Sequence, residues 1–315
     1  MITTRVGALE LRNPVMTASG TVGHSTELSR YVDLSRLGAV VVKSIAPFAW
    51  EGNPPPRLAP TTSGMLNSVG LQGMGAEAWV RDEFPKLHAQ RVTTVASVWG
   101  FGVQDYVDAA RTVATAPIAA IEINLSCPNV SGHPPASLSS HQIFAHDESL
   151  VREIVRGIAG FGVPVWAKLS PNTDRLVAIA AAAAEEGATA VTLINTALGM
   201  VIDPRTGKPR LGNGGGGLSG PAIHPLAVRA VFDVHRAIPQ LPIVGVGGVV
   251  GVDDALEMMM AGASAVQVGT AHFAQPRTSV RLVTALDRWA ERNGVREWSE
   301  IVGIAHRGGR NTSRG

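Results

Sequence analysis

The sequence predicts an α/β fold, a (β/α)8 TIM barrel, and three observations support that prediction. Eight short apolar segments, rich in Val and Ile, alternate with helical segments along the 315 residues. Strands of such uniformly apolar composition are typical of a parallel sheet that is covered on both faces. No shift in composition marks a domain boundary, so we expect residues 1–315 to form one domain. A doubly wound open sheet is the alternative architecture for the same alternation.

The elements are expected in a regular order. Residues 3–14 alternate around Gly7 and predict a small N-terminal β-hairpin ahead of the barrel. The eight strands are predicted at 15–20, 39–44, 93–99, 120–127, 163–171, 190–196, 242–248 and 265–270. The helices are predicted at about 25–37, 76–87, 104–115, 148–161, 176–186, 226–238, 253–261 and 279–294.

Three segments lack helical or strand periodicity. Residues 52–72 and 199–217 are expected to be long loops, and long ordered loops tend to carry function. Residues 131–140 are polar and rich in Pro and Ser, as in a lid or a simple loop. We expect residues from about 300 to 315 to form a flexible tail.

Composition narrows the class of protein. The formal net charge is +2, and the basic pI near 9.0 comes without a basic stripe, which argues against nucleic-acid binding. No uncharged apolar run reaches about 18 residues, so no membrane span is expected. The N-terminus has no apolar core of signal-peptide length. The single cysteine excludes an intrachain disulfide and fits a cytoplasmic location.

That cysteine lies where the fourth strand ends. Cys127 precedes Pro128, which has no backbone N–H and stops the strand. Asn124, Ser126 and Asn129 surround it, an unusual polar end for a buried strand. Cys127 as a small buried residue among turn-forming asparagines is the simpler interpretation. The convergence of four hydrogen-bonding side chains favours a binding site.

Polar residues also end the other strands, as expected for the active end of a barrel. They are Ser19, Lys43, Ser97, Asn124, Lys168, Asn195 with Thr196, Gly247-Gly248 and Gly269-Thr270. The glycines of strands seven and eight suit a phosphate bound by backbone N–H groups, or they only turn the chain. The two lysines suit an anionic ligand or an electron-rich cofactor, although lysines at such positions also extend to solvent. The histidines lack metal-ligand spacing, so no metal site is expected.

Taken together, these motifs resemble the dihydroorotate dehydrogenase family, class 1, whose base is a cysteine. The similarity covers about residues 5 to 290. The stretches that carry it are Lys43-Ser44, Gly52-Asn-Pro-Pro-Pro-Arg57, Gly64-Met-Leu-Asn67-Ser-Val-Gly70-Leu71, Asn124-Leu-Ser-Cys127-Pro-Asn129, Ile194-Asn195-Thr196, Gly217-Leu-Ser-Gly220, Gly247-Gly248 and Gly269-Thr270. The segments at 52–57 and 64–67 are most similar to the catalytic subunit of subclass 1B, the NAD-linked type.

The resemblance implies an FMN-binding barrel that oxidises (S)-dihydroorotate to orotate in pyrimidine biosynthesis. Cys127 would be the base, with Lys43 as a second catalytic residue. FMN would be held by Ser19, Lys43, Ser44, Ser97, Asn124, Lys168, Ile194, Gly220, Gly247, Gly248, Gly269 and Thr270. The substrate would be held by Lys43, Asn67, Ser68, Val69, Gly70, Leu71, Asn124, Asn129, Asn195 and Thr196.

One position departs from the family pattern, and it bears on the flavin contact. Ser97, followed by Trp99, stands where the family usually has asparagine, and serine offers fewer hydrogen bonds. Subclass 1B implies a homodimeric core and a partner subunit that carries FAD and an iron–sulfur cluster. The rival is a class 1A homodimer that reduces fumarate. Two further alternatives are an FMN-dependent dihydropyrimidine dehydrogenase and a non-catalytic flavin-binding subunit.

Overall fold

Eight parallel strands close into a barrel in a computed structural model that describes residues 2–125 and 146–309. In chain order the strands are β3 (Val15–Thr17), β4 (Ala39–Val41), β7 (Thr94–Val98), β8 (Ala120–Asn124), β9 (Val165–Lys168), β10 (Ala190–Leu193), β15 (Ile243–Val246) and β16 (Ala265–Val268). Neighbours in sequence are neighbours in the barrel, and β16 pairs with β3 to complete it. The closed barrel is confirmed, and the open sheet is excluded.

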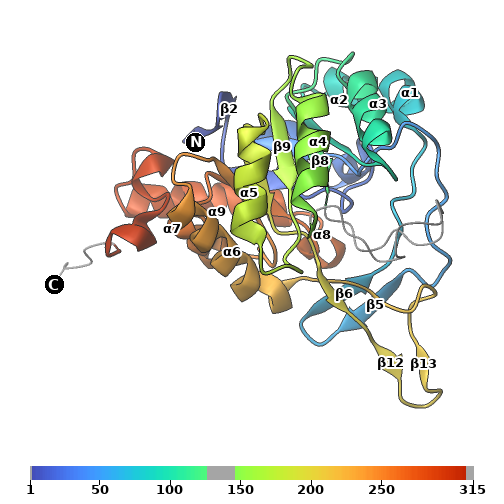
Figure 1. Cartoon of the computed structure of the whole chain (residues 1–315). Coiled ribbons are helices and arrows are strands. Elements are labelled where there is room, and N and C mark those ends of the chain that lie inside the picture. The colour runs from blue at the N-terminus through green and yellow to red at the C-terminus, as the bar shows by residue number, and fades with distance from the viewer. Residues whose placement is uncertain (1, 126–145, 310–315) are drawn as a thin grey trace.

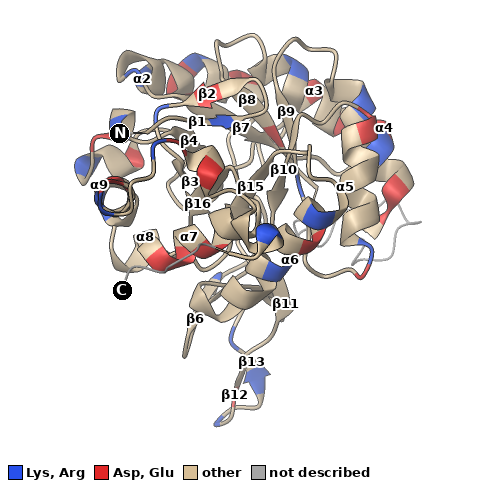
Figure 2. Cartoon of the chain, turned by 90° about the vertical axis from the view of Figure 1, so that its left-hand side faces the viewer, with Lys and Arg blue, Asp and Glu red and all other residues tan. Residues whose placement is uncertain are grey.

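Helices surround the barrel (Figure 1). They are α1 (Ala76–Ala78), a π-helical turn η3 (Trp79–Glu83), α2 (Phe84–Ala89), α3 (Val103–Val113), α4 (Glu148–Ile158), α5 (Leu176–Glu185), α6 (His224–Ala237), α7 (Val252–Ala261), α8 (Ala271–Ala274) and α9 (Thr278–Arg292). Charged residues lie mainly on these helices and on loops, while the strands are largely uncharged (Figure 2). Among the described residues, no helix is both long enough and apolar enough to span a bilayer.

Helix α4 illustrates why these segments are helical. Its buried residues, Val151, Ile154, Val155 and Ile158, recur at the spacing of one helical face. The side chain of Asp147 caps the first turn by accepting hydrogen bonds from two backbone N–H groups. The helix therefore presents one apolar stripe to the barrel and leaves its charged residues in solvent.

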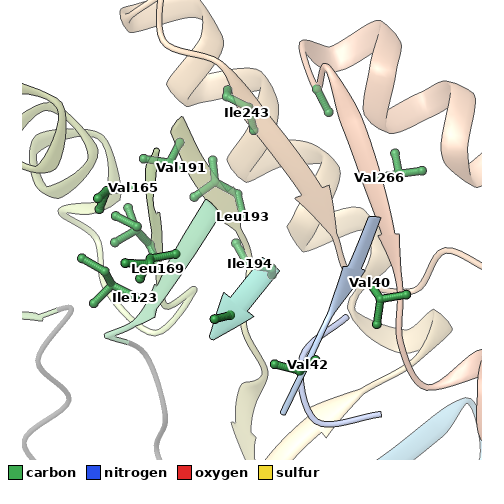
Figure 3. Packing of buried hydrophobic residues seen from close by; sticks show 14 of the residues in the cluster. Val40, Val42, Ile123, Val165, Leu169, Val191, Leu193, Ile194, Ile243 and Val266 are labelled. Atoms are coloured by element: carbon green, nitrogen blue, oxygen red, sulfur yellow. The ribbon is translucent and has the colours of Figure 1, made fainter. Parts of the chain in front are cut away.

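The strands alternate between two apolar layers. Val40, Ile123, Val191 and Ile243 belong to the large core formed with the surrounding helices, and Figure 3 shows them in that packing. The intervening residues, including Val41, Ala120, Ala190, Val244 and Ala265, form a separate cluster with the N-terminal hairpin. Side chains on a strand alternate with period two, so this second cluster fills the barrel interior.

The predicted hairpin is present as β1 (Thr4–Val6) and β2 (Leu9–Leu11), paired in antiparallel register around Gly7. Its buried residues Val6 and Leu11 join the interior cluster. The hairpin therefore covers the amino-terminal end of the barrel and leaves the opposite end open for a site.

The predicted helix at 25–37 is wrong. The segment forms two short 3-10 helices, η1 (Glu27–Arg30) and η2 (Leu34–Arg36). Asp33 separates them, because its side chain accepts a hydrogen bond from the N–H of Ser35 at 3.0 Å and starts a new turn. Aspartate side chains compete in this way with the hydrogen bonds of a continuous helix.

The two long loops are only partly irregular, and this corrects the prediction. Short strands within them form a four-stranded antiparallel sheet in the order β11 (Ala197–Gly199), β14 (Gly216–Ser219), β6 (Gly64–Asn67) and β5 (Leu58–Thr61). The chain between β11 and β14 adds the hairpin of β12 (Ile202–Asp203) and β13 (Lys208–Pro209), which projects from the barrel (Figure 1). The pairing of β6 with β14 joins segments about 150 residues apart, which local patterns do not reveal.

The first residues of the expected tail, up to residue 309, are packed against the barrel instead. Ile301 directly follows the 3-10 helix η6 (Trp298–Glu300) and is buried. Another 3-10 helix, η5 (Pro221–Ile223), directly precedes α6. The last 3-10 helix, η7 (Ile304–Arg307), contains His306, which stacks on Phe232 of α6 at 3.9 Å between ring centroids. Aromatic packing therefore holds this stretch against the barrel, and residues 310–315 lie outside the described residues.

Candidate functional site

A cavity opens at the carboxyl end of the barrel, between the strand ends and the four-stranded sheet. Most of the site residues predicted from the sequence line it. They are Ser19, Lys43, Ser44, Asn67, Val69, Gly70, Leu71, Asn124, Lys168, Ile194, Asn195, Thr196, Gly220, Gly247, Gly248, Gly269 and Thr270. These residues come from segments spread over some 250 positions, and the barrel brings them together because the carboxyl ends of parallel strands share one face.

The charge of the cavity is positive. Among its described lining residues, Lys43 and Lys168 are the only charged side chains, and no Asp or Glu lines it. Burial, reinforced by the nearby Lys43, lowers the pKa of His24. A neutral imidazole at His24 leaves Lys43 as the cation on that side. The cavity therefore suits an anionic ligand.

Ser44 is the centre of a hydrogen-bond network on the cavity wall. Its hydroxyl lies 2.9 Å from the Oγ of Ser97 and 3.2 Å from the Oγ of Ser19, and the side-chain amide of Asn124 donates to it at 2.9 Å. Ser44 is 1% exposed and Ser97 is fully buried, so these bonds are shielded from water. The network links the carboxyl ends of four neighbouring barrel strands, β3, β4, β7 and β8, and fixes the rotamers at the cavity wall.

Asn124 is oriented from several sides. Tyr106 of α3 donates a hydrogen bond from its hydroxyl to the Asn124 carbonyl at 2.8 Å. The Asn195 amide donates to the Asn124 side-chain oxygen at 3.4 Å. Asn172 donates to the carbonyl of Thr196 at 3.1 Å. The amide groups on this side of the cavity are therefore held in place for directed hydrogen bonds to a ligand.

Glycines shape the far side of the cavity at the ends of β15 and β16, which are adjacent strands. Gly247, Gly248 and Gly220 have φ values of +136°, +70° and +94°, a region that side chains disfavour. A Cβ added to Gly248 would lie 2.9 Å from the carbonyl oxygen of Gly220. His224 Nδ1 lies 2.8 Å from the Gly247 carbonyl oxygen. The backbone here packs closely and is open to a ligand that binds main-chain groups.

Two predicted site residues lie behind the cavity wall rather than in it. Ser68 and Ser97 are fully buried and do not line it. Ser68 instead accepts a hydrogen bond from Asn53 at 2.9 Å, and Ser97 reaches the site only through Ser44. The predicted contact of Ser97 with the flavin stays a prediction. Cys127 and Asn129 lie outside the described residues, so their predicted roles stay predictions.

Trp99, near Ser97 in the sequence, is buried behind the cavity wall. It is 1% exposed and packs against Phe48 and Phe101, with ring centroids 5.8 Å and 5.0 Å apart. It lies outside the set of residues that line the cavity. The tryptophan thus supports the wall from behind rather than altering the cavity.

The sequence analysis missed some residues that line the cavity and the buried carboxylate beneath the cavity. Met65 and Ser219 line the cavity from β6 and β14, and Val250 and Phe273 line it as half-exposed apolar residues. The antiparallel sheet was not predicted, so its inward side chains had no local signal. Glu122 is fully buried in the barrel interior, and a carboxylate inside an apolar strand was the signal that could have identified it.

Comparison with known proteins identifies the family. The family model described as dihydroorotate dehydrogenase matches residues 1–289. A dihydroorotate dehydrogenase B (NAD(+)) catalytic subunit of Desulforudis audaxviator is 45% identical over 305 residues, which is 96% of this chain and 97% of that protein. The protein of the same name in Pelobacter propionicus is 42% identical over 304 residues, with 96% and 97% covered.

A relative whose name gives a different electron acceptor is almost as similar. A putative dihydroorotate dehydrogenase A (fumarate) of Solibacter usitatus is 41% identical over 304 residues, again 96% of this chain and 97% of that protein. The similarity extends over the barrel, the added sheet and the cavity. Because the family model matches most of its length, this chain belongs to the dihydroorotate dehydrogenase family.

Proposed function

We propose that this protein is an FMN-dependent enzyme that oxidises (S)-dihydroorotate to orotate, with electrons passed to NAD through a partner subunit. The observation that carries the proposal is the cavity itself. It combines two lysines, no described acidic lining residue, and a set of oriented amides at the open end of the barrel. An anionic pyrimidine and a phosphorylated cofactor both match this chemistry.

The residues present fit FMN. Gly220, Gly247, Gly248, Gly269 and Thr270 form a close-packed backbone cradle where a phosphate would bind. Ser19, Lys43, Ser44, Asn124, Lys168 and Ile194 would hold the rest of the cofactor. When bound, FMN would supply the hydride acceptor, and the protein would orient it and set its electrostatic surroundings.

The substrate contacts would come from amide, hydroxyl and ammonium groups of the same cavity. Asn67, Asn124, Asn195 and Thr196 offer amide and hydroxyl groups to a pyrimidine ring. Lys43, with the backbone at Val69 to Leu71, suits the carboxylate of dihydroorotate. A neutral dihydropyrimidine would leave that lysine without a ligand charge, which favours dihydroorotate over the dihydropyrimidine alternative.

Cys127 would remove the proton from the substrate carbon next to the carbonyl. The thiolate is the base, and a free thiol has a pKa of about 8.5, so the rate should rise as pH increases toward that value. Lys43 would stabilise negative charge that develops during the transfer. The role of Cys127 rests on its place in the Asn124 to Asn129 segment.

The names of the relatives support the acceptor and the partner. Two of them are named catalytic subunits of the NAD(+) enzyme, which implies a separate electron-transfer subunit in those proteins. We propose that this chain likewise forms a homodimeric core with a subunit that carries FAD and an iron–sulfur cluster, in the cytoplasm. Direct fumarate reduction is the second candidate, and the Solibacter usitatus relative favours it.

Anaerobic reduction tests the function. The purified protein should be yellow and should bleach on addition of dihydroorotate, because the substrate reduces the bound flavin. Cys127→Ser should stay yellow and bleach at least about 100-fold more slowly, within the range expected for loss of a catalytic base. Lys208→Met on the projecting hairpin is exposed and should bleach at the normal rate. A colourless protein that takes up no FMN would contradict the proposal.

The acceptor is tested separately. Reoxidation of the bleached protein by fumarate alone would favour the second candidate. Reoxidation by NAD only after addition of a co-purified flavin and iron–sulfur subunit would support the first. The two outcomes can be told apart in one stopped-flow experiment on the same reduced protein.

A further inference from the structure

A buried carboxylate lies beneath the cavity. Glu122 is fully buried on β8, two positions after Ala120 of the interior cluster, and the period of the strand directs both side chains into the barrel. Its Oε2 accepts hydrogen bonds from Thr192 Oγ1 at 3.0 Å and from Gln267 Nε2 at 2.8 Å. These two neutral donors fix the carboxylate from β10 and β16.

The other carboxylate oxygen faces a cation. Glu122 Oε1 lies 3.5 Å from Nζ of Lys168, which is 4% exposed and lines the cavity. At this distance the contact is an ion pair that is longer than a charge-assisted hydrogen bond of about 2.8 Å. A lysine ammonium has three donors. Lys168 can therefore be held by Glu122 and still donate to a ligand in the cavity.

An ion pair between Glu122 and Lys168 is unusual inside a barrel, where apolar side chains normally fill the space. Placing two charges in a dry interior is expensive, and apolar residues of similar volume are often as stable or more stable. The interior layer below Glu122, which includes Ala120, Ala190 and Ala265, is apolar. The Glu122–Lys168 pair lies at the level of the cavity floor, and this position points to a role in ligand chemistry rather than in stability.

We propose that Glu122 is a positioning residue that holds Lys168 at the cavity floor and partly neutralises its charge. This inference rests on the proposed function, because the ligand that senses Lys168 is the flavin. A bare cation beside the ring would favour the reduced flavin, which carries more negative charge. Glu122 moderates that preference and so keeps the flavin able to pass its electrons on.

The test is the midpoint potential of the bound flavin in Glu122→Gln, measured by dye-coupled reductive titration of the FMN-loaded protein. Glutamine keeps the volume and an acceptor oxygen but removes the charge. The flavin should become easier to reduce by at least tenfold in its equilibrium constant, which is about 30 mV for a two-electron couple. Lys168→Met should shift the potential in the opposite direction.

Thr192→Val is the matched control. It removes one hydrogen bond to the same carboxylate and leaves both charges in place. Its potential should stay within about twofold of the wild-type equilibrium constant, about 9 mV. If Thr192→Val and Glu122→Gln shift the potential equally, the effect is one of packing, and the proposal is wrong.

A double variant keeps the proposal testable if Glu122→Gln does not fold with an unpaired buried lysine. Glu122→Gln combined with Lys168→Met contains neither charge and avoids that cost. If Glu122 acts through Lys168, the double variant should have the same potential as Lys168→Met alone, since Glu122 then has no ammonium group to hold or to neutralise. A difference of more than tenfold between them would overturn the inference.

Failure of this inference differs from failure of the proposed function. A wild-type protein that binds no FMN overturns both. A wild-type protein that binds FMN and bleaches with dihydroorotate, but whose potential does not respond to Glu122→Gln, overturns only the role of Glu122. FMN affinity, measured by quenching of flavin fluorescence, gives a second readout that does not depend on turnover.

Discussion

Replacing Ser44 by alanine should destabilise the protein and loosen the cavity wall at once. The Ser44 hydroxyl lies within 3.2 Å of hydroxyls on Ser19 and Ser97 and accepts from Asn124 at 2.9 Å. Without it, the fully buried Ser97 hydroxyl loses its partner on Ser44, and an unsatisfied buried polar group costs about 1–3 kcal/mol. The lost hydrogen bond from Asn124 adds about 1 kcal/mol, so we expect the free energy of unfolding to fall by about 2–4 kcal/mol in total.

Urea unfolding of the FMN-free protein measures this free energy without interference from ligand binding. Ser29→Ala is the matched control, because the Ser29 hydroxyl makes an equally short bond of 2.8 Å to Gln90 but lies on the surface. It should change the free energy by less than about 0.5 kcal/mol. Ser44→Ala combined with Ser97→Ala should cost less than the sum of the two single changes, because both partners are then removed. A Ser44→Ala protein as stable as the Ser29→Ala control would refute the network.

Three further predictions follow from the geometry. A methyl at Gly217 would lie 2.5 Å from Cβ of Thr196, a proposed substrate contact. Gly217→Ala should therefore raise KM for dihydroorotate about tenfold, which is about 1.4 kcal/mol. The FMN content, read from the absorption spectrum, should stay unchanged. Gly248 has φ +70°, and its added Cβ would lie 2.7 Å from Cβ of His224, so Gly248→Ala should lower the flavin-to-protein absorbance ratio of the purified protein. Burial lowers the pKa of His272 to about 4, whereas the unfolded chain has a histidine pKa of about 6.5. The unfolded state therefore binds the proton at a higher pH than the folded state, and the free energy of unfolding falls as pH drops from about 6.5 to 4. His272→Gln should remove roughly 2 kcal/mol of the stability change between about pH 7.5 and 5, seen as a smaller shift of the urea midpoint; an unchanged shift would contradict it.

Local patterns were sufficient for the barrel but not for the structure between its strands. All eight strands lie where apolar runs were predicted, since burial on both faces leaves a strong local signal. The helix predicted at 25–37 failed because Asp33 caps a new turn within it. The sheet over the cavity was missed because β6 finds its partner β14 about 150 residues later. Pairing over that distance depends on closure of the barrel.

For the site, too, the sequence predicted some features, and others depended on contacts between distant segments. Most predicted residues line the cavity because the carboxyl ends of parallel strands share one face, a property that follows from the fold class alone. Ser97 is buried behind the wall and bonds to Ser44, which follows the neighbouring strand β4, so its predicted flavin contact stays a prediction. Family motifs identify which residue type stands at each position. They do not show whether its side chain reaches the cavity or is buried behind the cavity wall.

The sequence by itself determined the class of fold, the end of the barrel that carries the site, and the family, because strand order and motif order are properties of the chain. Only the tertiary structure decided which polar side chains face a ligand and which face one another. Glu122 meets Gln267 and Lys168 because three strands close around one axis. The direction of a side chain relative to that axis is fixed by pairing between distant strands, and no local pattern contains it.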